Sequence, residues 1–128
     1  MTESEREVEQ FHAAWVAAVR RGDLETILGF LAPDYVLWAP GTPPLVGRET
    51  MLPMLAAAFA KFAIEPSFEC EQRLVTDDLA VERGWDVQTV RPRDGGPAKT
   101  QRQRVTLVLR KADGRWQFAW GMAQPEPA

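Results

Sequence analysis

The chain has 128 residues, 45% of them hydrophobic, and a formal net charge of -3 at pH 7. This length excludes a second core of useful size, so we expect one domain over residues 1–124 and a frayed tail over 125–128. The single cysteine and single histidine exclude an internal disulfide and a Cys/His metal site, so we expect a reducing, cytoplasmic location, no metal and no other cofactor.

Two helices are predicted at the start of the chain. Ser4 and Glu7 have the spacing of a capping box, after which apolar residues recur at helical spacing at Val8, Phe11, Trp15 and Val19. Gly22 ends this helix, and Asp23 is placed to cap a second, shorter one. The second helix carries Leu24, Ile27, Leu28 and Leu31, and it ends at Pro33 and Asp34.

A strand, a loop and a third helix follow. Residues 35–39 predict a short buried strand, and the prolines and glycine of residues 40–44 predict a loop. The third helix comes after Gly47, and its apolar face consists of Leu52, Leu55, Phe59 and Phe62. Because proline is tolerated only in the first turn of a helix, Pro53 requires this helix to begin near Glu49.

From Ile64 onward the hydrophobic pattern changes to period two. It predicts an antiparallel meander of four strands, at about residues 65–76, 79–91, 100–111 and 115–122. Strands of this length twist, and a sheet made of them tends to curl. We therefore predict an α+β fold, in which three N-terminal helices pack on a strongly curved, mainly antiparallel sheet that encloses a pocket.

Charge and apolar patterning exclude two classes of partner. Residues 1–90 carry 7 basic and 15 acidic side chains (net -8), and residues 91–128 carry 8 basic and 3 acidic ones (net +5). The basic residues of the second segment are not interleaved with aromatic residues on which nucleic-acid bases could stack, so we expect no nucleic-acid partner. The acidic N-terminus lacks the pattern of a signal peptide, and no apolar run is long enough to span a membrane.

Several short motifs occur in an order that resembles a known family. They are Arg-Gly-Asp-Leu at 21–24, Leu-Ala-Pro-Asp-Tyr at 31–35, Val-Gly-Arg-Glu at 46–49, Arg-Val-Thr-Leu-Val-Leu-Arg at 104–110 and Asp-Gly-Arg-Trp at 113–116. Together with the predicted elements they resemble the SnoaL-like branch of the nuclear-transport-factor-2-like (NTF2-like) superfamily, which also contains ketosteroid isomerases and polyketide cyclases. The resemblance implies a cone-shaped, cystatin-like roll. It implies no single reaction, because this fold hosts enzymes, binding proteins and oligomerisation modules.

The resemblance also implies that the isomerase catalytic residues are missing. Ala39 stands where the isomerases carry a general-base aspartate, and Trp15 stands where they carry a tyrosine that stabilises the oxyanion. Their second carboxylic acid corresponds to Thr106. Many SnoaL-like chains carry a histidine near the end of the last strand, where this chain has Met122. Without these groups, isomerisation next to a carbonyl has no evident machinery.

Tryptophan is abundant, at 5 of 128 residues. We predict a cavity bounded by Trp15, Trp38, Trp85 and Trp120, with Met122 beside it. Such a cavity would suit a small aromatic or polycyclic ligand. Each ring could instead fill the core, which is the commoner role of a buried aromatic side chain.

His12 is the candidate catalytic residue. It lies three residues before Trp15 and therefore shares its helix face. Histidine changes charge near neutral pH, which suits proton transfer. The alternative is a hydrogen-bonded core histidine without a catalytic role.

Arginines on two strands are candidate ligand contacts. In the strand at 79–91 the odd positions share one face, and the resemblance turns this face, with Arg83 and Trp85, toward the cavity. A buried arginine needs a protein carboxylate or an acidic ligand group beside it.

The strand at 100–111 has two possible orientations. The resemblance favours Arg104 and Thr106 facing the pocket, whereas hydrophobicity favours the set of Val105, Leu107 and Leu109. The sequence leaves both open.

Apolar residues on both faces of a long sheet need cover on both faces, so we expect a homodimer through the face opposite the cavity. Two functions stay open. The first is binding of a small organic molecule, with cyclase-, isomerase- or hydratase-like chemistry in secondary or catabolic metabolism. The second is a non-catalytic dimerisation or ligand-sensing module.

Overall fold

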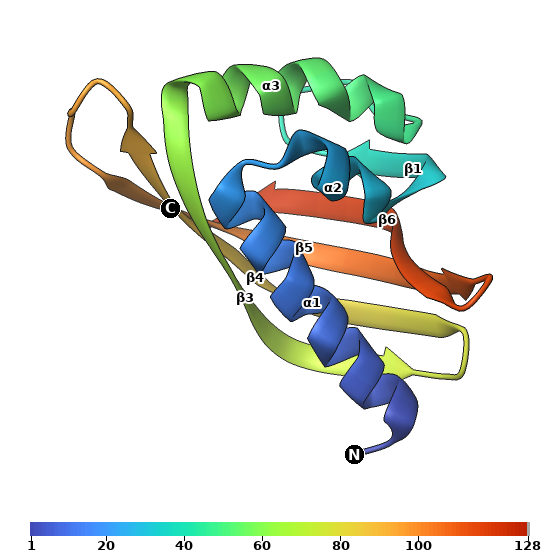
Figure 1. The fold of residues 1–128 in the computed structure, drawn as a ribbon. Coiled ribbons are helices and arrows are strands. Elements are labelled where there is room, and N and C mark those ends of the chain that lie inside the picture. Colours follow the sequence, from blue (N-terminus) through green and yellow to red (C-terminus); the bar gives the residue numbers. More distant parts are fainter. Residues whose placement is uncertain (128) are drawn as a thin grey trace.

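Helices occupy the first half of the chain and long strands the second half (Figure 1). The computed structural model describes residues 1–127. Its helices are α1 (Glu3–Arg21), α2 (Leu24–Gly29), the 3-10 helix η1 (Arg48–Met51) and α3 (Leu52–Lys61). Its strands are β1 (Leu31–Trp38), β2 (Leu45–Val46), β3 (Phe62–Val75), β4 (Leu79–Pro92), β5 (Lys99–Ala112) and β6 (Arg115–Pro125).

Helix α1 begins earlier than predicted. Its N-cap is Thr2, whose side-chain oxygen accepts a hydrogen bond from the backbone nitrogen of Glu5 at 3.1 Å. The prediction was wrong because Ser4 and Glu7 repeat the same three-residue spacing two positions later. The predicted end at Gly22 is confirmed: this residue has φ of 62°, a left-handed conformation that glycine adopts readily.

Helix α2 is shorter than predicted. Asp23 caps it as expected, but the helix stops at Gly29 and β1 begins at Leu31, so the predicted helix end near Pro33 is wrong. Strand β1 pairs in parallel with β6, and its register shifts between Leu31 and Val36. Pro33 lies in this irregular stretch, where its missing N–H is tolerated.

The third helix is confirmed, with a 3-10 turn at its start. Helix η1 covers the region around Glu49, α3 takes over at Leu52, and Pro53 is accommodated in the first turn of α3. Phe62, predicted on the apolar face of this helix, instead begins β3. Residues 40–44 form the predicted loop, and β2 follows it.

The strands form a six-stranded sheet in the order β2-β1-β6-β5-β4-β3. Strands β3 to β6 make the predicted antiparallel meander, and β1 adds to β6 in parallel. Figure 1 shows the sheet curving strongly, with α1 crossing its concave side and α2 and α3 continuing the helical layer. The predicted α+β fold, with helices on a curved, mainly antiparallel sheet, is confirmed.

Extra residues in two strands change which side chains face the helices. In β3 the extra residue is Glu71, and in β6 it is Ala119. An extra residue reverses the alternation of faces in the part of the strand that follows. Phe118, before the β6 bulge, is therefore buried, whereas Trp120, after it, is 59% exposed.

The hydrophobic core lies between the helices and the concave face of the sheet. One cluster joins α1 to the sheet and contains Val8, Phe11, Leu31, Tyr35, Met51, Ala80, Leu109, Trp116 and Phe118. A second cluster joins the three α-helices and contains Ala18, Val19, Ile27 and Phe59. Trp15 packs against both clusters. Burial of these side chains holds the helical layer over the concave face.

The C-terminal strand ends close to the predicted domain boundary. Strand β6 runs to Pro125, which pairs with Gln103. Ala128, part of the predicted tail, lies outside the described residues. The single-domain boundary at residues 1–124 stays a prediction. Among residues 1–127, no helix is both long and apolar enough to cross a membrane.

Candidate functional site

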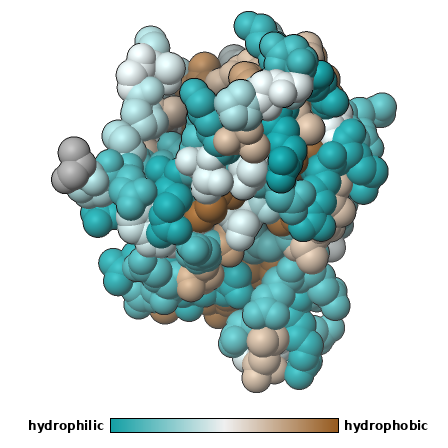
Figure 2. All heavy atoms as spheres, turned by 90° about the vertical axis from the view of Figure 1, so that its left-hand side faces the viewer, coloured by the Kyte–Doolittle hydropathy of each residue, from teal (hydrophilic) through white to brown (hydrophobic). Residues whose placement is uncertain are grey.

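A cavity of about 340 Å³ lies between the helices and the concave face of the sheet. Its wall is mostly apolar and includes Trp15, Leu37, Met54, Phe68, Leu107 and Phe118. Polar side chains enter it at His12, Ser67, Asp86, Gln88 and Gln103. Figure 2, which views the end of the molecule at the left of Figure 1, shows hydrophobic surface in the hollowed centre of that face with hydrophilic residues around it.

Strand β4 turns its more polar side chains inward. Asp86 and Gln88 line the cavity, and Glu82 is completely buried. The prediction that the odd positions of this strand face the cavity is wrong, because Arg83 and Trp85 line a hollow on the opposite face of the sheet. A one-residue offset in matching a strand to its family exchanges its two faces, which accounts for the error.

On β5 the orientation based on hydrophobicity is correct. Val105 and Leu107 line the cavity beside Gln103. Arg104 and Thr106 line the outer hollow instead, so their predicted position in the cavity is wrong.

Of the four tryptophans predicted to bound the cavity, only Trp15 lines it among the described residues. Trp38 and Trp120 are more than half exposed, because the bulge at Ala119 turns the end of β6 over and β1 follows it in register. Met122 lines the cavity and also reaches the outer hollow. The apolar part of the enclosure is therefore mostly aliphatic, and its aromatic members are Trp15, Tyr35, Phe68 and Phe118.

The outer hollow, of about 470 Å³, brings together Arg83, Trp85, Arg104, Thr106 and Met122. The guanidinium groups of Arg102 and Arg104 lie 4.6 and 5.3 Å from the centre of the Trp85 ring, within cation–π range. The Trp85 Nε1 donates a hydrogen bond to Glu71 Oε1 at 2.7 Å. Five of the predicted ligand contacts are thus neighbours around this outer hollow, and of the five only Met122 also lines the cavity.

Asp86 is the carboxylic acid of the cavity, and the sequence reasoning missed it. Its Oδ2 accepts hydrogen bonds from Gln88 Nε2 at 3.2 Å and from Gln103 Nε2 at 3.3 Å. Burial raises the pKa of Asp86, and the two amide hydrogen bonds oppose this rise. A carboxyl group with a raised pKa in an apolar cavity is typical of acid–base sites.

Tyr35 is the second polar group that was missed. Burial raises the pKa of Tyr35 to about 12, so its hydroxyl stays protonated at neutral pH. A Cβ added at Gly121 would lie 2.6 Å from the Tyr35 hydroxyl oxygen. The glycine at position 121 therefore leaves the space that this hydroxyl occupies. The Leu-Ala-Pro-Asp-Tyr motif contains Tyr35, but in the sequence it marks only the start of a strand.

Asp86 Oδ1 and the Tyr35 hydroxyl are two of the cavity's polar atoms that stay available to a ligand. Among residues 1–127, these two atoms have no hydrogen-bond partner in the protein. Every side-chain nitrogen or oxygen that is completely enclosed in this part of the chain does have a partner. Neither atom is therefore completely enclosed by protein, although Tyr35 as a whole is buried. Each lies on a residue that lines the cavity. The cavity thus combines an apolar wall with an acceptor and a donor.

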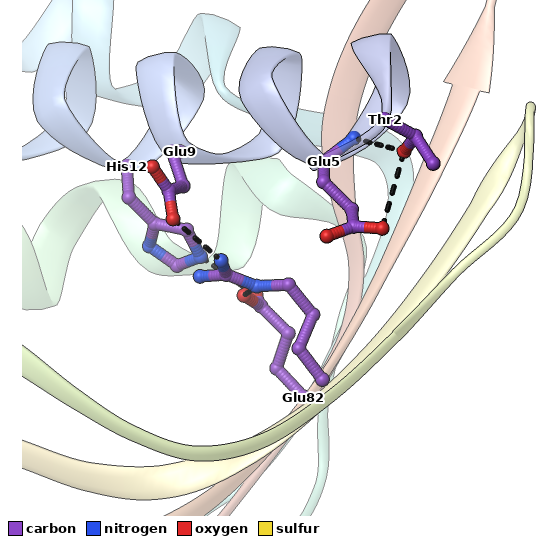
Figure 3. Close-up of polar contacts among 6 residues, drawn as sticks. Thr2, Glu5, Glu9, His12 and Glu82 are labelled. Atoms are coloured by element: carbon purple, nitrogen blue, oxygen red, sulfur yellow. Dashed lines mark hydrogen bonds and ion pairs between the residues drawn. The ribbon is translucent and has the colours of Figure 1, made fainter.

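His12 belongs to a charged chain beside the cavity. Its Nε2 lies 2.6 Å from Glu82 Oε1, and the other carboxylate oxygen of Glu82 accepts from Arg73 Nε at 2.6 Å. Arg73 also pairs with Glu9 at 3.5 Å. Figure 3 shows His12 and Glu9 pointing from α1 toward Glu82 on the sheet. Among residues 1–127, no three histidine, cysteine or acidic side chains gather in a group that could hold a metal ion.

The SnoaL-like domain profile matches residues 12–118 of the sequence. The chain belongs to the SnoaL-like domain family. No curated protein matches the sequence.

Solved structures share the fold of this SnoaL-like chain. A conserved protein from Planctomyces limnophilus DSM 3776 superimposes with a TM-score of 0.85 at 24% identity, over 95% of this chain and 97% of the other. A ketosteroid isomerase-like protein from Erwinia carotovora atroseptica SCRI1043 gives 0.79 at 22%, over 100% of both chains. An NTF2-like protein with a cystatin-like fold from Novosphingobium aromaticivorans gives 0.78 at 16%, over 96% of this chain and 82% of the other. The predicted resemblance to the SnoaL-like family is confirmed by the domain profile, and these structures confirm the cystatin-like fold.

Replacing the cavity carboxyl should make the SnoaL-like chain more stable at neutral pH. Because the folded state raises the pKa of Asp86, folding disfavours its ionised form, and stability falls as pH rises from the ordinary aspartate pKa of about 3.9 through the raised value. We expect Asp86→Asn to be more stable than wild type in urea unfolding at pH 7, and this gain to disappear below about pH 3.9. Asp77→Asn, in an exposed turn, is the control for charge removal. A gain that persists unchanged in acid would contradict the burial of this carboxyl.

Proposed function

We propose that this chain binds a small, flat, mainly apolar organic molecule in the cavity, oriented by one hydroxyl or carbonyl group. The observation that carries the proposal is the pair of unpartnered polar atoms, Asp86 Oδ1 and the Tyr35 hydroxyl, in a mainly apolar enclosure. Ligand sites commonly combine an apolar wall with a few well-placed polar groups. The candidate contacts predicted from the sequence that line the same cavity are His12, Trp15 and Met122.

The chemistry that this arrangement supports best is proton transfer. Asp86 would act as the acid or base, because its raised pKa brings proton exchange nearer to neutral pH. The protonated Tyr35 hydroxyl would donate a hydrogen bond to an oxygen of the ligand that gains charge. This pair of roles suits cyclase-, isomerase- and hydratase-like reactions in which charge develops on an oxygen of the ligand. Since the resemblance places Ala39, directly after β1, where the isomerases carry their base, the acid–base group would come from β4 instead.

The binding proposal can be tested with 2-naphthol, a flat aromatic alcohol. We expect saturable binding in isothermal titration calorimetry, and Val105→Trp, which fills the cavity, should weaken it by at least roughly tenfold. Val108→Trp changes the same strand but does not line the cavity, so it is the matched control and should bind normally. Equal binding by both variants would show that the probe binds elsewhere and would remove the cavity from the proposal.

We propose that the chain forms a homodimer through the outer face of the sheet, with a second copy of the chain as its partner. This face carries unusually exposed apolar side chains, at Trp38, Leu79, Val81, Trp120 and Met122. A contiguous apolar patch of this kind marks an interaction surface. A second copy is self-complementary, since a two-fold interface presents the same patch from both sides. Dimerisation alone, without ligand chemistry, is the alternative function.

Trp120→Glu should disrupt this dimer. We expect wild type to sediment at twice the monomer mass, and the variant to dimerise roughly thirtyfold more weakly, about 2 kcal/mol, as for a central tryptophan in an interface. Val46→Glu, an equally exposed apolar position on edge strand β2, is the control and should stay dimeric. A wild-type chain that sediments as a monomer at high micromolar concentration would end the dimer proposal.

The cytoplasm is the location that we propose for this chain. Its only cysteine, Cys70, is free and exposed. An exposed thiol without a disulfide partner fits a reducing compartment.

A further inference from the structure

His12 stands in a wall that separates two spaces. On one side of this wall is the cavity. On the other side is a groove of about 600 Å³ between α1 and β3, which is distinct from the outer hollow around Trp85. The residues that line both spaces are His12, Val16, Pro66, Ser67 and Phe68. The histidine side chain is only 12% exposed. It is therefore a nearly buried titratable group at the boundary of the proposed ligand site.

The carboxylate of Glu82 determines which nitrogen of His12 carries the proton. Glu82 is completely buried, and one of its oxygens lies 2.6 Å from His12 Nε2. A carboxylate can only accept hydrogen bonds, so this contact requires the hydrogen on Nε2. Arg73 occupies the second oxygen at 2.6 Å and keeps the carboxylate from turning away. Nδ1 of the neutral ring is then left with a free lone pair.

Aromatic neighbours prevent the ring from swinging. The imidazole stacks on Phe68 with the ring centres 4.9 Å apart and the planes inclined by 16°. Phe11 and Phe118 contact it edge-on, at 6.0 and 5.8 Å. Figure 3 shows one ring nitrogen of His12 directed to Glu82 and the other directed away from it. The direction of Nδ1 is thus fixed by packing as well as by the hydrogen bond.

Nδ1 itself is not completely enclosed by protein. Among residues 1–127 it has no hydrogen-bond partner. A completely enclosed side-chain atom would have one, because all such atoms in this part of the chain are paired. The charged and titratable groups around His12 are Glu9 on α1, Arg73 and Cys70 on β3, Glu82 on β4 and, in the cavity, Asp86. Glu82 already binds Nε2, and Arg73 and Glu9 pair with each other and with Glu82. None of the contacts in this set uses Nδ1.

We propose that Glu82 and Arg73 are positioning residues that hold His12 as the Nε2–H tautomer, so that Nδ1 accepts a hydrogen bond or a proton from a hydroxyl group of the ligand. This inference rests on the proposed function, and it adds a second acceptor besides Asp86. If Nδ1 takes the proton, the ligand oxygen keeps the electron pair of its O–H bond and the imidazole becomes a cation next to the Glu82 carboxylate. The ligand class is accordingly a phenol, enol or alcohol rather than a ligand with only acceptor groups.

The experiment is nitrogen-15 NMR of the side chain, which is unusually direct because His12 is the only histidine in the sequence. Long-range correlations from the two ring C–H protons to the ring nitrogens distinguish Nε2 from Nδ1. At about pH 8.5, above the ordinary titration range of histidine, we expect the protonated nitrogen to be Nε2 and the bare nitrogen to be Nδ1. A wild-type spectrum with the hydrogen on Nδ1, or with rapid exchange of both tautomers, would overturn the proposal without any variant.

Two variants test the role of Glu82. Glu82→Gln offers an amide that can donate as well as accept, so the preference for Nε2–H should be lost and a tautomer mixture should appear. Glu65→Gln removes a carboxylate that pairs with Arg20 in the same groove, and it should leave the His12 spectrum unchanged. An unaltered tautomer in a folded Glu82→Gln protein would mean that Glu82 does not position the ring. If Glu82→Gln does not fold, the wild-type spectrum decides.

Addition of 2-naphthol separates this inference from the proposed function. We expect the Nδ1 resonance to move on saturation while Nε2 keeps its hydrogen. Binding by calorimetry without a change at Nδ1 would contradict the inference but leave cavity binding standing. Absence of binding would overturn the ligand proposal, while the tautomer of the free protein would still report on Glu82 as a positioning residue.

Discussion

The close approach of β3 and β4 at Gly84 is the constraint on which the rest of the structure depends. A Cβ at this position would lie 2.1 Å from the carbonyl oxygen of Glu69 and 3.0 Å from Cα of Cys70. Beside it, Glu71 is an extra residue in β3. A bulge increases the local twist and bends the strand. Glycine therefore allows the two backbones to meet where the sheet turns, and the turn makes the concave face that the helices cover.

The bend is accompanied by a distribution of side chains that is unusual for a sheet covered by helices. Strand β4 directs Glu82 and Asp86 inward and leaves Leu79 and Val81 exposed outside. The carboxyl groups inside need hydrogen-bond partners, and the apolar side chains outside need a surface that covers them. Inside, Glu82 is satisfied by His12 and Arg73, and Asp86 by two amides with one oxygen remaining for a ligand. Outside, an apolar face of this kind is most simply covered by a second copy. The ligand and dimer proposals are thus two consequences of one strand orientation.

The sequence predicted the elements much better than the faces. Helical spacing, Asp23 and Gly22 at the helix ends, and period-two strands identified most of the fold, because these signals are local. The face that a strand presents depends on bulges, and near Ala119 the sequence offers only Gly121, a signal too general to place the extra residue. Trp120 was therefore assigned to the wrong side. Asp86 was missed for a related reason: an isolated acidic residue in a strand has the pattern of solvent exposure until its neighbours are known.

The stability of Gly84→Ala measures the central constraint most directly. Overpacking against backbone that cannot move should lower the free energy of unfolding in urea by about 3 kcal/mol. Gly29→Ala is the matched substitution, because its new Cβ would meet nothing closer than 4.0 Å at the end of α2, and it should leave stability unchanged or raise it by up to about 1 kcal/mol. A Gly84→Ala protein as stable as Gly29→Ala would contradict the account, because β3 and β4 would then not meet closely at the bend.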